Sequence, residues 1–359
     1  MVRLAIAGTG GMADYQAKKF AQVKGCVLVA CKDHKHEQGV AFAARHGISQ
    51  CFDDIEKLLD AGVCDALSCA VLDGRHRGIC EPSIARCIPV LCEKPLARSL
   101  ADCQSMVDAV TVAGVPNMIN FSKRNAPALV VLRDLVKSGM LGQIHAIEAT
   151  YLQGWVLSKV WGDWRTIPRW RWRMIPESST EGVVGDLGSH IVDSLLFVFG
   201  DLTVEKPGVS TSLSDIVSDG LLSMGDVPPE FFGSPKPVCV EFSGSARVFN
   251  TVQATIKASW IDVSSVDDFK IIVRGTKMDA HLDLKKSRNS IETLDNSTGM
   301  IKTVQGKPVV STYECFISLA ESWLKEKNIT VNETCFPDFA HGLRVQRILD
   351  RLVEGGLPE

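Results

Sequence analysis

The chain has 359 residues, a formal net charge of −3, 45% hydrophobic residues and 23% charged residues. The length predicts two globular domains, and no apolar run reaches the roughly 18 residues that span a membrane. Lysine and arginine are scattered, which argues against nucleic acid as a partner. Twelve cysteines without any C-x-x-C spacing are typical of free buried thiols, so we expect no metal and a cytoplasmic protein.

The first half alternates short apolar strands with helical stretches. A strand is predicted over Val2–Ala7, the turn GTGGMA follows at 8–13, and a helical pattern runs from about Asp14 to Val23. The next strand, Cys26–Cys31, is followed after one residue by Asp33. This layout is typical of a dinucleotide-binding βαβ unit.

In that unit Gly8 makes the tight turn, Gly10 lets the backbone approach a pyrophosphate, and Ala13 allows close packing of helix on strand. Glycine-rich turns are common, and the motif gains its value from lying between a strand and a helix. Asp33 follows Ala13 by 20 residues, where a carboxylate can accept from ribose hydroxyls. The expected cofactor contacts from this region are Gly8, Thr9, Gly10, Gly11, Met12 and Asp33.

Two further strands, Cys64–Leu72 and Pro89–Cys92, continue the alternation and predict a parallel sheet. Ligands of such sheets bind beyond the carboxyl ends of the strands. We therefore expect further cofactor contacts from Val71, Leu72, His76, Glu93 and Lys94. An alternative for Glu93-Lys94-Pro95 is a simple strand stop, because proline lacks an N–H donor and restricts the residue before it.

Strand-like runs dominate the second half, and they predict an α+β domain with a large, mainly antiparallel open sheet. The runs cover Ile144–Leu152, Val238–Trp260, Phe269–Arg274 and Ser290–Leu294. Residues 205–237, rich in proline and glycine, predict a long excursion with little regular structure. Helical patterns at Tyr313–Lys327 and Phe339–Val353 close the chain. We place the first domain at 1–121 and the second at 122–359, with the last helix packing back on the first domain.

The segment GVVGDLGSHIVDSLLFVFG, residues 182–200, holds the candidate proton-transfer groups. Asp186 and His190 are four residues apart, so on a helix they point to the same side, and Asp193 follows one turn later. Histidine exchanges a proton near neutral pH, and a carboxylate one turn away can orient it or hold a substrate hydroxyl. The alternative is a helix capped by its aspartate with a locally packed histidine.

Five of the seven tryptophans lie between Trp155 and Trp172. The arginines interleaved with them are Arg165, Arg169, Arg171 and Arg173. Rings and guanidinium groups together suit a carbohydrate or polyol pocket, and they are equally typical of a subunit interface.

The whole pattern resembles the glucose-fructose oxidoreductase, inositol dehydrogenase and rhizopine-catabolism family of NAD(P)-dependent oxidoreductases. The resemblance covers nearly the whole chain, and its motifs are GTGGMA at 8–13, EKP at 93–95, MINFSKRNAP at 118–127, GDLGSHIVD at 185–193 and FPDFAHGLRVQRILD at 336–350. It implies an N-terminal Rossmann domain and a C-terminal open-sheet domain that often mediates oligomerisation, here a homodimer or homotetramer. The sequence departs from the family pattern at Val71-Leu72, where many members have Thr-Pro, and at Lys32 before Asp33.

Carried over residue by residue, the resemblance implies catalytic roles for Lys94, Asp186 and His190. It also places Arg124 near the substrate, and we add Trp172 from the tryptophan-rich segment. The expected reaction moves a hydride between nicotinamide and a secondary alcohol of a sugar, inositol or related polyol. We expect NAD to be preferred, with NADP also used because Lys32 and Lys35 flank Asp33. The alternatives are a catalytically inactive nucleotide-sensing regulator and a dehydrogenase of a non-sugar cyclic diol.

Overall fold

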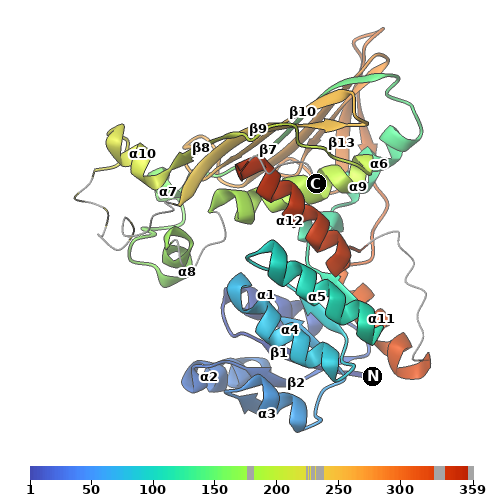
Figure 1. Cartoon of the computed structure of the whole chain (residues 1–359). Helices are drawn as coiled ribbons and strands as arrows, with labels where there is room; N and C mark the ends of the chain where they lie inside the picture. The colour runs from blue at the N-terminus through green and yellow to red at the C-terminus, as the bar shows by residue number, and fades with distance from the viewer. Residues whose placement is uncertain are drawn as a thin grey trace. The chain divides into compact units, whose positions relative to one another are not determined.

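The computed structural model describes residues 1–175, 182–223, 225, 227, 231, 238–326 and 336–354. The chain forms two compact units (Figure 1). Residues 1–122 and 310–346 make the first unit, and residues 123–309 and 347–359 make the second. The first unit is therefore built from both ends of the chain.

The first unit is built on a six-stranded parallel sheet in the order β3-β2-β1-β4-β5-β6. Its strands are β1 (Val2–Ala7), β2 (Cys26–Lys32), β3 (Gln50–Phe52), β4 (Ala66–Cys69), β5 (Val90–Cys92) and β6 (Asn117–Ile119). This is the strand order of the dinucleotide-binding fold, which confirms the predicted Rossmann domain. The order reverses between β1 and β4, and ligands of this fold bind at the carboxyl ends of the strands around that point.

The helices of the first unit begin and end at residues with clear local reasons. They are α1 (Gly11–Phe20), α2 (His36–His46), α3 (Ile55–Asp60), η1 (Asp73–Arg75), α4 (His76–Ala85), α5 (Leu100–Ala113), α11 (Thr312–Glu326) and the start of α12 (Phe339–Glu354). Asp54 and Ser99 accept backbone N–H groups at the starts of α3 and α5, and Gly114 ends α5 in the left-handed region. The α1 helix begins three residues before the predicted Asp14, because the Asp14 N–H already donates to the Gly10 carbonyl.

The second unit is built on an eight-stranded sheet in the order β14-β13-β12-β11-β7-β10-β9-β8. Its strands are β7 (Ile144–Leu152), β8 (Val209–Ser212), β9 (Cys239–Val248), β10 (Val252–Ser259), β11 (Asp268–Gly275), β12 (Met278–Asp283), β13 (Ser290–Asp295) and β14 (Ile301–Gln305). All neighbours are antiparallel except β7 and β10. The predicted large, mainly antiparallel sheet is therefore confirmed.

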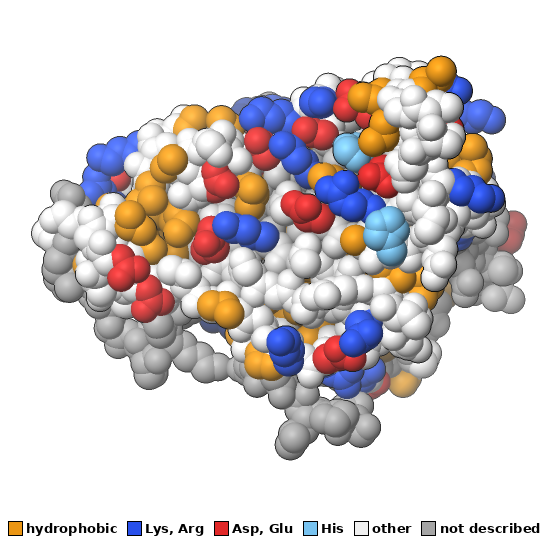
Figure 2. All heavy atoms as spheres, turned by 90° about the horizontal axis from the view of Figure 1, so that it is seen from above, with side chains coloured by type: hydrophobic (Ala, Val, Ile, Leu, Met, Phe, Trp, Pro, Cys, Tyr) orange, Lys and Arg blue, Asp and Glu red, His pale blue; other side chains and the backbone are white. Residues whose placement is uncertain are grey.

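Helices cover one face of this sheet (Figure 1). The helical segments of the second unit are η2 (Ser122–Asn125), α6 (Pro127–Lys137), α7 (Trp155–Ser158), α8 (Pro168–Arg171), η3 (Trp172–Met174), η4 (Val184–Gly188), α9 (Ser189–Phe199) and α10 (Leu213–Ser218). Alternate residues of β7, including Ile147 and Ala149, are buried, and α9 packs against this strand. The opposite face, seen from above in Figure 2, carries Lys, Arg, Asp and Glu side chains of both signs with scattered apolar ones.

The excursion predicted for 205–237 is more regular than its composition suggests. It contains β8 and α10, and α10 begins with a reciprocal cap in which Ser212 and Asp215 each accept the other's backbone N–H. Leu213, Ile216 and Val217 bury one side of this short helix. The prediction of little structure was therefore wrong for 209–218, and residues 224, 226, 228–230 and 232–237 lie outside the described part. Within that part, no helix combines the length and apolar character needed to cross a membrane.

Candidate active site

The turn at 8–10 joins β1 to α1 through backbone that requires glycine at its first position. Gly8 has a φ of +97°, and a Cβ there would lie 2.5 Å from the carbonyl oxygen of Ala70. At Gly10 a Cβ would meet no described atom within 4 Å, and no described side chain caps the first turn of α1. Gly11 and Met12 begin the helix at the surface. The N–H groups of this turn can therefore bind an anionic group such as a pyrophosphate.

Asp33 follows β2, and its carboxylate is held beside the turn. The Thr9 hydroxyl donates to Oδ2 at 2.6 Å, and the Lys35 backbone N–H donates to Oδ1 at 2.9 Å. His34 Nδ1 lies 3.1 Å from Oδ1. A carboxylate fixed in this way suits ribose hydroxyls, and it repels a 2′-phosphate. The glycine turn and Asp33 together fit NAD.

The ends of β4 and β5 bring the next predicted contacts to the same edge of the sheet. The Glu93 N–H donates to the Cys69 carbonyl at 2.9 Å. His76 is buried, with Nδ1 3.0 Å from the Leu96 carbonyl and Nε2 3.2 Å from the Val71 carbonyl. The imidazole therefore bridges the two segments that follow these strands. Leu72, the next residue after Val71, is partly exposed at 39%.

Glu93 is a buried carboxylate held by uncharged side chains. Its Oε1 accepts from Gln16 Nε2 and from Asn120 Nδ2, both at 2.6 Å. Gln16 in turn accepts from the Ser68 hydroxyl at 2.6 Å. Asn120 Nδ2 also lies 3.4 Å from the Tyr313 hydroxyl. Gln16, Asn120 and Tyr313 were not foreseen from the sequence.

The surroundings of Glu93 act on its pKa in opposite directions. Burial raises the pKa of Glu93, while the hydrogen bonds from Asn120 and Gln16 and the positive charge of Lys94 act in the opposite direction. Lys94 is half-buried, and its peptide bond to Pro95 is cis. The Lys94 N–H lies 3.3 Å from Glu93 Oε2. The end of β5 before Pro95 is therefore fixed by the hydrogen bonds of Glu93 with Gln16, Asn120 and the Lys94 N–H.

In the second unit, Asp186 and His190 lie on consecutive helical turns. Asp186 belongs to a single π-helical turn, Val184–Gly188, and His190 to the α-helix that continues from it. Single π turns inside helices are frequent at functional sites. Arg173 Nε donates to Asp186 Oδ2 at 3.2 Å. Asp186 is therefore a partly exposed carboxylate with a cationic partner, and His190 is buried to 7% exposure.

Tyr151 lies beside the histidine and Lys123 contacts Tyr151, and sequence reasoning missed both. Lys123 Nζ donates to the Tyr151 hydroxyl at 3.0 Å, and the rings of Tyr151 and His190 lie 6.1 Å apart. Burial raises the pKa of Tyr151 well above its ordinary value, and the carboxylates of Asp267 and Asp186 raise it further. Their separation in sequence left no local signal that these groups meet.

Arg124 and Asp193 form a buried ion pair. Arg124 Nε lies 3.0 Å from Oδ1 and 3.1 Å from Oδ2 of Asp193, and Nη2 lies 2.6 Å from Oδ1. The two side chains are 8% and 0% exposed. The guanidinium also lies 4.8 Å from the centre of the Phe197 ring. This ion pair joins η2 to α9. Arg124 therefore has a structural role in addition to the substrate contact predicted from the sequence.

The tryptophan-rich segment divides between core and surface. Trp155 and Trp164 are 1% exposed, and Trp164 Nε1 donates to the Val156 carbonyl at 3.1 Å. Trp172 is half-buried, with its ring 4.5 Å from the Arg173 guanidinium. Because Arg173 also holds Asp186, Trp172 is connected to the candidate catalytic groups. The side chain of Arg169 lies outside the described set.

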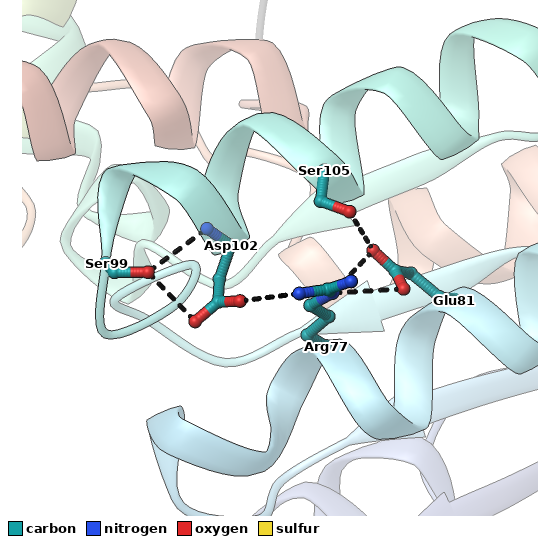
Figure 3. Close-up of polar contacts among 5 residues, drawn as sticks. All are labelled: Arg77, Glu81, Ser99, Asp102 and Ser105. Atoms are coloured by element: carbon teal, nitrogen blue, oxygen red, sulfur yellow. Dashed lines mark hydrogen bonds and ion pairs between the residues drawn. The ribbon is translucent and has the colours of Figure 1, made fainter.

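A hollow of about 580 Å³ lies in the first unit along α3, α4 and α5. Arg77 on α4 donates to Glu81 and Asp102, and the Ser99 and Ser105 hydroxyls complete the network (Figure 3). These charged side chains already satisfy one another. The hollow is therefore lined by a surface ion-pair network, and we assign it no part in the active site.

Two family models match consecutive parts of the chain. The oxidoreductase family with an NAD-binding Rossmann fold matches residues 2–121, and the GFO/IDH/MocA C-terminal domain matches residues 129–281. The chain belongs to the GFO/IDH/MocA oxidoreductases.

Relatives of known name include 1,5-anhydro-D-fructose reductase of Ensifer adhaerens, 31% identical over 55% of this chain and 57% of that protein. Levoglucosan dehydrogenase of Pseudarthrobacter phenanthrenivorans is 25% identical over 52% of this chain and 46% of that protein. The chain thus matches about half the length of these curated GFO/IDH/MocA relatives. Among solved structures, an inositol dehydrogenase homologue from Azotobacter vinelandii complexed with NAD⁺ has a TM-score of 0.83 at 16% identity, covering 99% and 96% of the two chains. That likeness shows the fold.

Proposed function

We propose that this GFO/IDH/MocA protein is an NAD-dependent dehydrogenase of a secondary alcohol on a sugar, inositol or related polyol. The names of the relatives above, a reductase of 1,5-anhydro-D-fructose and a dehydrogenase of levoglucosan, support this substrate class. The observation that carries the proposal is the helical pair Asp186 and His190, with Arg173 bonded to the carboxylate. A protein that only sensed nucleotides would have no need of that pair.

The cofactor is proposed to bind the carboxyl edge of the first sheet. The N–H groups at the start of α1 hold its phosphates, and Asp33 holds a ribose. Val71, Leu72, His76 and Glu93 are proposed to shape the region nearer the nicotinamide. Bound NAD supplies a hydride acceptor, which no amino-acid side chain provides.

His190 is the proposed base. When the carbinol carbon loses a hydride, the hydroxyl must also lose its proton, and the O–H electron pair becomes part of the new carbonyl bond. His190 accepts that proton, since imidazole does so near neutral pH. Asp186 positions His190 or a neighbouring hydroxyl, and Arg173 holds the carboxylate in place.

Lys94 is the proposed electrophilic partner of the same hydroxyl. Its ammonium holds the reacting oxygen and favours the negative charge that develops there. The network around Glu93 gives the Lys94 backbone a fixed position, so little reorganisation is needed during the reaction. Arg124 and Trp172 remain proposed contacts to the rest of the substrate.

We also propose that the protein is a homodimer or homotetramer assembled through the open face of the second sheet. That face carries charges of both signs (Figure 2), and ion pairs Lys257–Glu241 and Lys270–Asp283 join neighbouring strands of the sheet. Charge patterns of mixed sign can register one copy against another.

The described cysteines are all free, which supports a reducing compartment such as the cytoplasm.

A panel of sugars, inositols and anhydrosugars tests the function by absorbance of reduced nicotinamide, with NAD and NADP assayed separately. We expect turnover of at least one cyclic polyol, with NAD preferred and NADP also used. Lys94→Ala is the matched variant, expected to keep NADH affinity within a few-fold while kcat falls by about two to four orders of magnitude. Tight NADH binding without turnover of any polyol would favour the inactive sensor, and turnover of only a non-sugar diol would favour the other alternative.

A further inference from the structure

Three buried cysteines of the first unit meet although no two are near each other in sequence. Cys69 ends β4, Cys92 ends β5, and Cys80 lies in α4. Their sulfur atoms all lie within 4.8 Å of one another, and each residue is 0% exposed. Cys69 and Cys92 are register partners on adjacent parallel strands. The spacings of 11 and 12 residues hide this cluster from a search for C-x-x-C.

The separation of the sulfurs is close to that of ligands sharing one soft centre. Three sulfurs spaced evenly around one centre, each bonded at about 2.3 Å, lie at most about 4.0 Å from one another. Small movements of three side chains would therefore bring the cluster into range. Soft thiophilic centres are the ones that cysteine sulfur selects.

The number of ligands and their burial decide which centre fits. Structural zinc prefers four ligands in a tetrahedron, and within the described residues this cluster supplies three. All three residues are 0% exposed, so a cation that holds them as thiolates leaves costly buried charge. A trivalent, three-coordinate centre that forms a neutral product avoids both difficulties.

We propose that Cys69, Cys80 and Cys92 form a binding site for a three-coordinate thiophilic centre, of which trivalent arsenic is the best match. Arsenous acid exchanges its three hydroxyl groups for three sulfurs. Each S–H proton leaves with one hydroxyl as water, arsenic stays trivalent, and the product is uncharged. Entry requires only a local opening of the unit, because the reagent is small and neutral.

The site lies directly behind the proposed cofactor edge. Cys69 precedes Ala70, Val71 and Leu72, and Cys92 precedes Glu93 and Lys94. Drawing the sulfurs together moves the ends of β4 and β5, so arsenite should weaken NADH binding. This second readout rests on the proposed cofactor site, whereas arsenic binding itself does not.

Arsenite binding to the reduced, full-length chain tests the proposal. Native mass spectrometry should show one arsenic per chain with the loss of three protons, and the arsenic X-ray absorption edge should show three sulfur neighbours. Cys80→Ala should weaken binding by about a hundredfold or more, because two linked thiols give a much lower effective concentration than three. Cys103→Ala is the matched control, since Cys103 is equally buried in the same unit and lies outside the cluster; it should bind arsenite as the wild type does.

Two results would overturn the assignment. Fewer than three sulfur neighbours in the wild-type spectrum do so without any variant, and so does equal arsenite affinity in Cys80→Ala and wild type. If Cys80→Ala does not fold, Cys80→Ser and Cys92→Ser serve in its place, with circular dichroism as the check. NADH titration by fluorescence, with and without arsenite, then separates the outcomes: unchanged NADH affinity in an arsenic-loaded chain removes the link to the cofactor edge and leaves the binding site standing.

Discussion

The two units bury a carboxylate in opposite ways. In the first unit Glu93 accepts hydrogen bonds from the neutral amides of Gln16 and Asn120, and burial raises its pKa. In the second unit Asp193 is fully buried and is held by a bidentate contact with the Arg124 guanidinium. The difference teaches that neutral partners leave burial to raise the pKa of the first acid, whereas an opposite charge holds the second as part of the scaffold.

Breaking the Arg124–Asp193 pair should give the largest effect on stability. Asp193→Ala leaves a buried guanidinium without its carboxylate, so we expect the free energy of unfolding to fall by about 3–5 kcal/mol. Urea unfolding measures it. Arg247→Ala, which removes the exposed Arg247–Glu205 pair of the same unit, is the control and should change little.

Arg124→Lys separates scaffold from substrate contact at this pair. Lysine keeps the charge but loses the bidentate geometry. A lowered stability with an unchanged KM supports the scaffold role. A raised KM with wild-type stability would instead support the substrate contact predicted from the sequence.

Asp186, a partly exposed acid of the second unit, differs from the buried Asp193 because it is proposed to act in the reaction rather than in the scaffold. His190→Ala should slow alcohol oxidation by roughly a hundredfold or more and weaken its pH dependence near neutrality. Asp186→Asn should cost less, and the double variant little beyond His190→Ala, since a base and its positioning carboxylate act as a unit. Single-turnover hydride transfer and thermal midpoints of all three variants decide between chemistry and a helix cap. Lowered midpoints with unchanged chemistry would remove the pair from the active site.

The titratable acid of the first unit should reveal itself in the pH dependence of stability. The pKa of Glu93 in the folded protein is raised above its ordinary value of 4.5, so the folded state binds this proton more tightly than the unfolded state. Its contribution is fully present below pH 4.5 and is lost as pH rises through the folded pKa. Relative to Glu93→Gln, the wild type should therefore become less stable as the pH rises above 4.5 and through the raised pKa of Glu93.

Thermal midpoints of the two proteins across that range give the answer. Asp14 is a control of opposite sign, because its hydrogen bond with Lys18 and the partners His46 and Arg45 lower its pKa from 3.8 to about 2. The contribution of Asp14 is present above pH 3.8 and is lost as pH falls through about 2. A wild-type to Glu93→Gln difference that is constant with pH would show that Glu93 does not titrate in this window.

The exposed network on α4 and α5 should give the smallest effect (Figure 3). Arg77→Ala removes the donors to Glu81 and Asp102, and all three side chains are at least partly open to solvent. Such pairs are screened by water and salt, so we expect the thermal midpoint to fall by less than about 3 °C, with kcat unchanged. A larger fall, or a loss of activity, would contradict the separation of this surface from the site.

Local patterns in the sequence predicted the elements that carry the site, and long-range contacts escaped them. The Gly8 turn, the Glu93-Lys94-Pro95 strand end and the Asp186-His190 spacing each depend on a few neighbouring residues. Gln16 and Asn120 reach Glu93 across 77 and 27 residues, and Tyr313 reaches Asn120 across 193. Only the strand order brings such groups together, and periodicity does not encode it.

The strand β14 and the cysteine cluster were also missed. The strand β14 lies at the edge of the sheet and alternates weakly, and its Ile301 is 68% exposed. The cysteines belong to three separate elements. An alternating pattern appears in the sequence only where one face of a strand is covered. The three cysteines can be grouped only when the neighbours of their elements are known.

The late segment of the first unit has a consequence for the order of folding. Tyr313, Phe316, Ile317 and Ala320 of α11 belong to the same buried cluster as Val2, Leu4 and Phe20 near the start of the chain. The Ile119 N–H also donates to the Pro337 carbonyl. A ribosome therefore delivers residues 123–309 of the second unit before it releases the residues that complete the first, and until then the apolar side of β1 and α1 lacks its cover. We expect the emerging chain to engage chaperones through this uncovered surface, and to acquire NADH affinity only after α11 has been made.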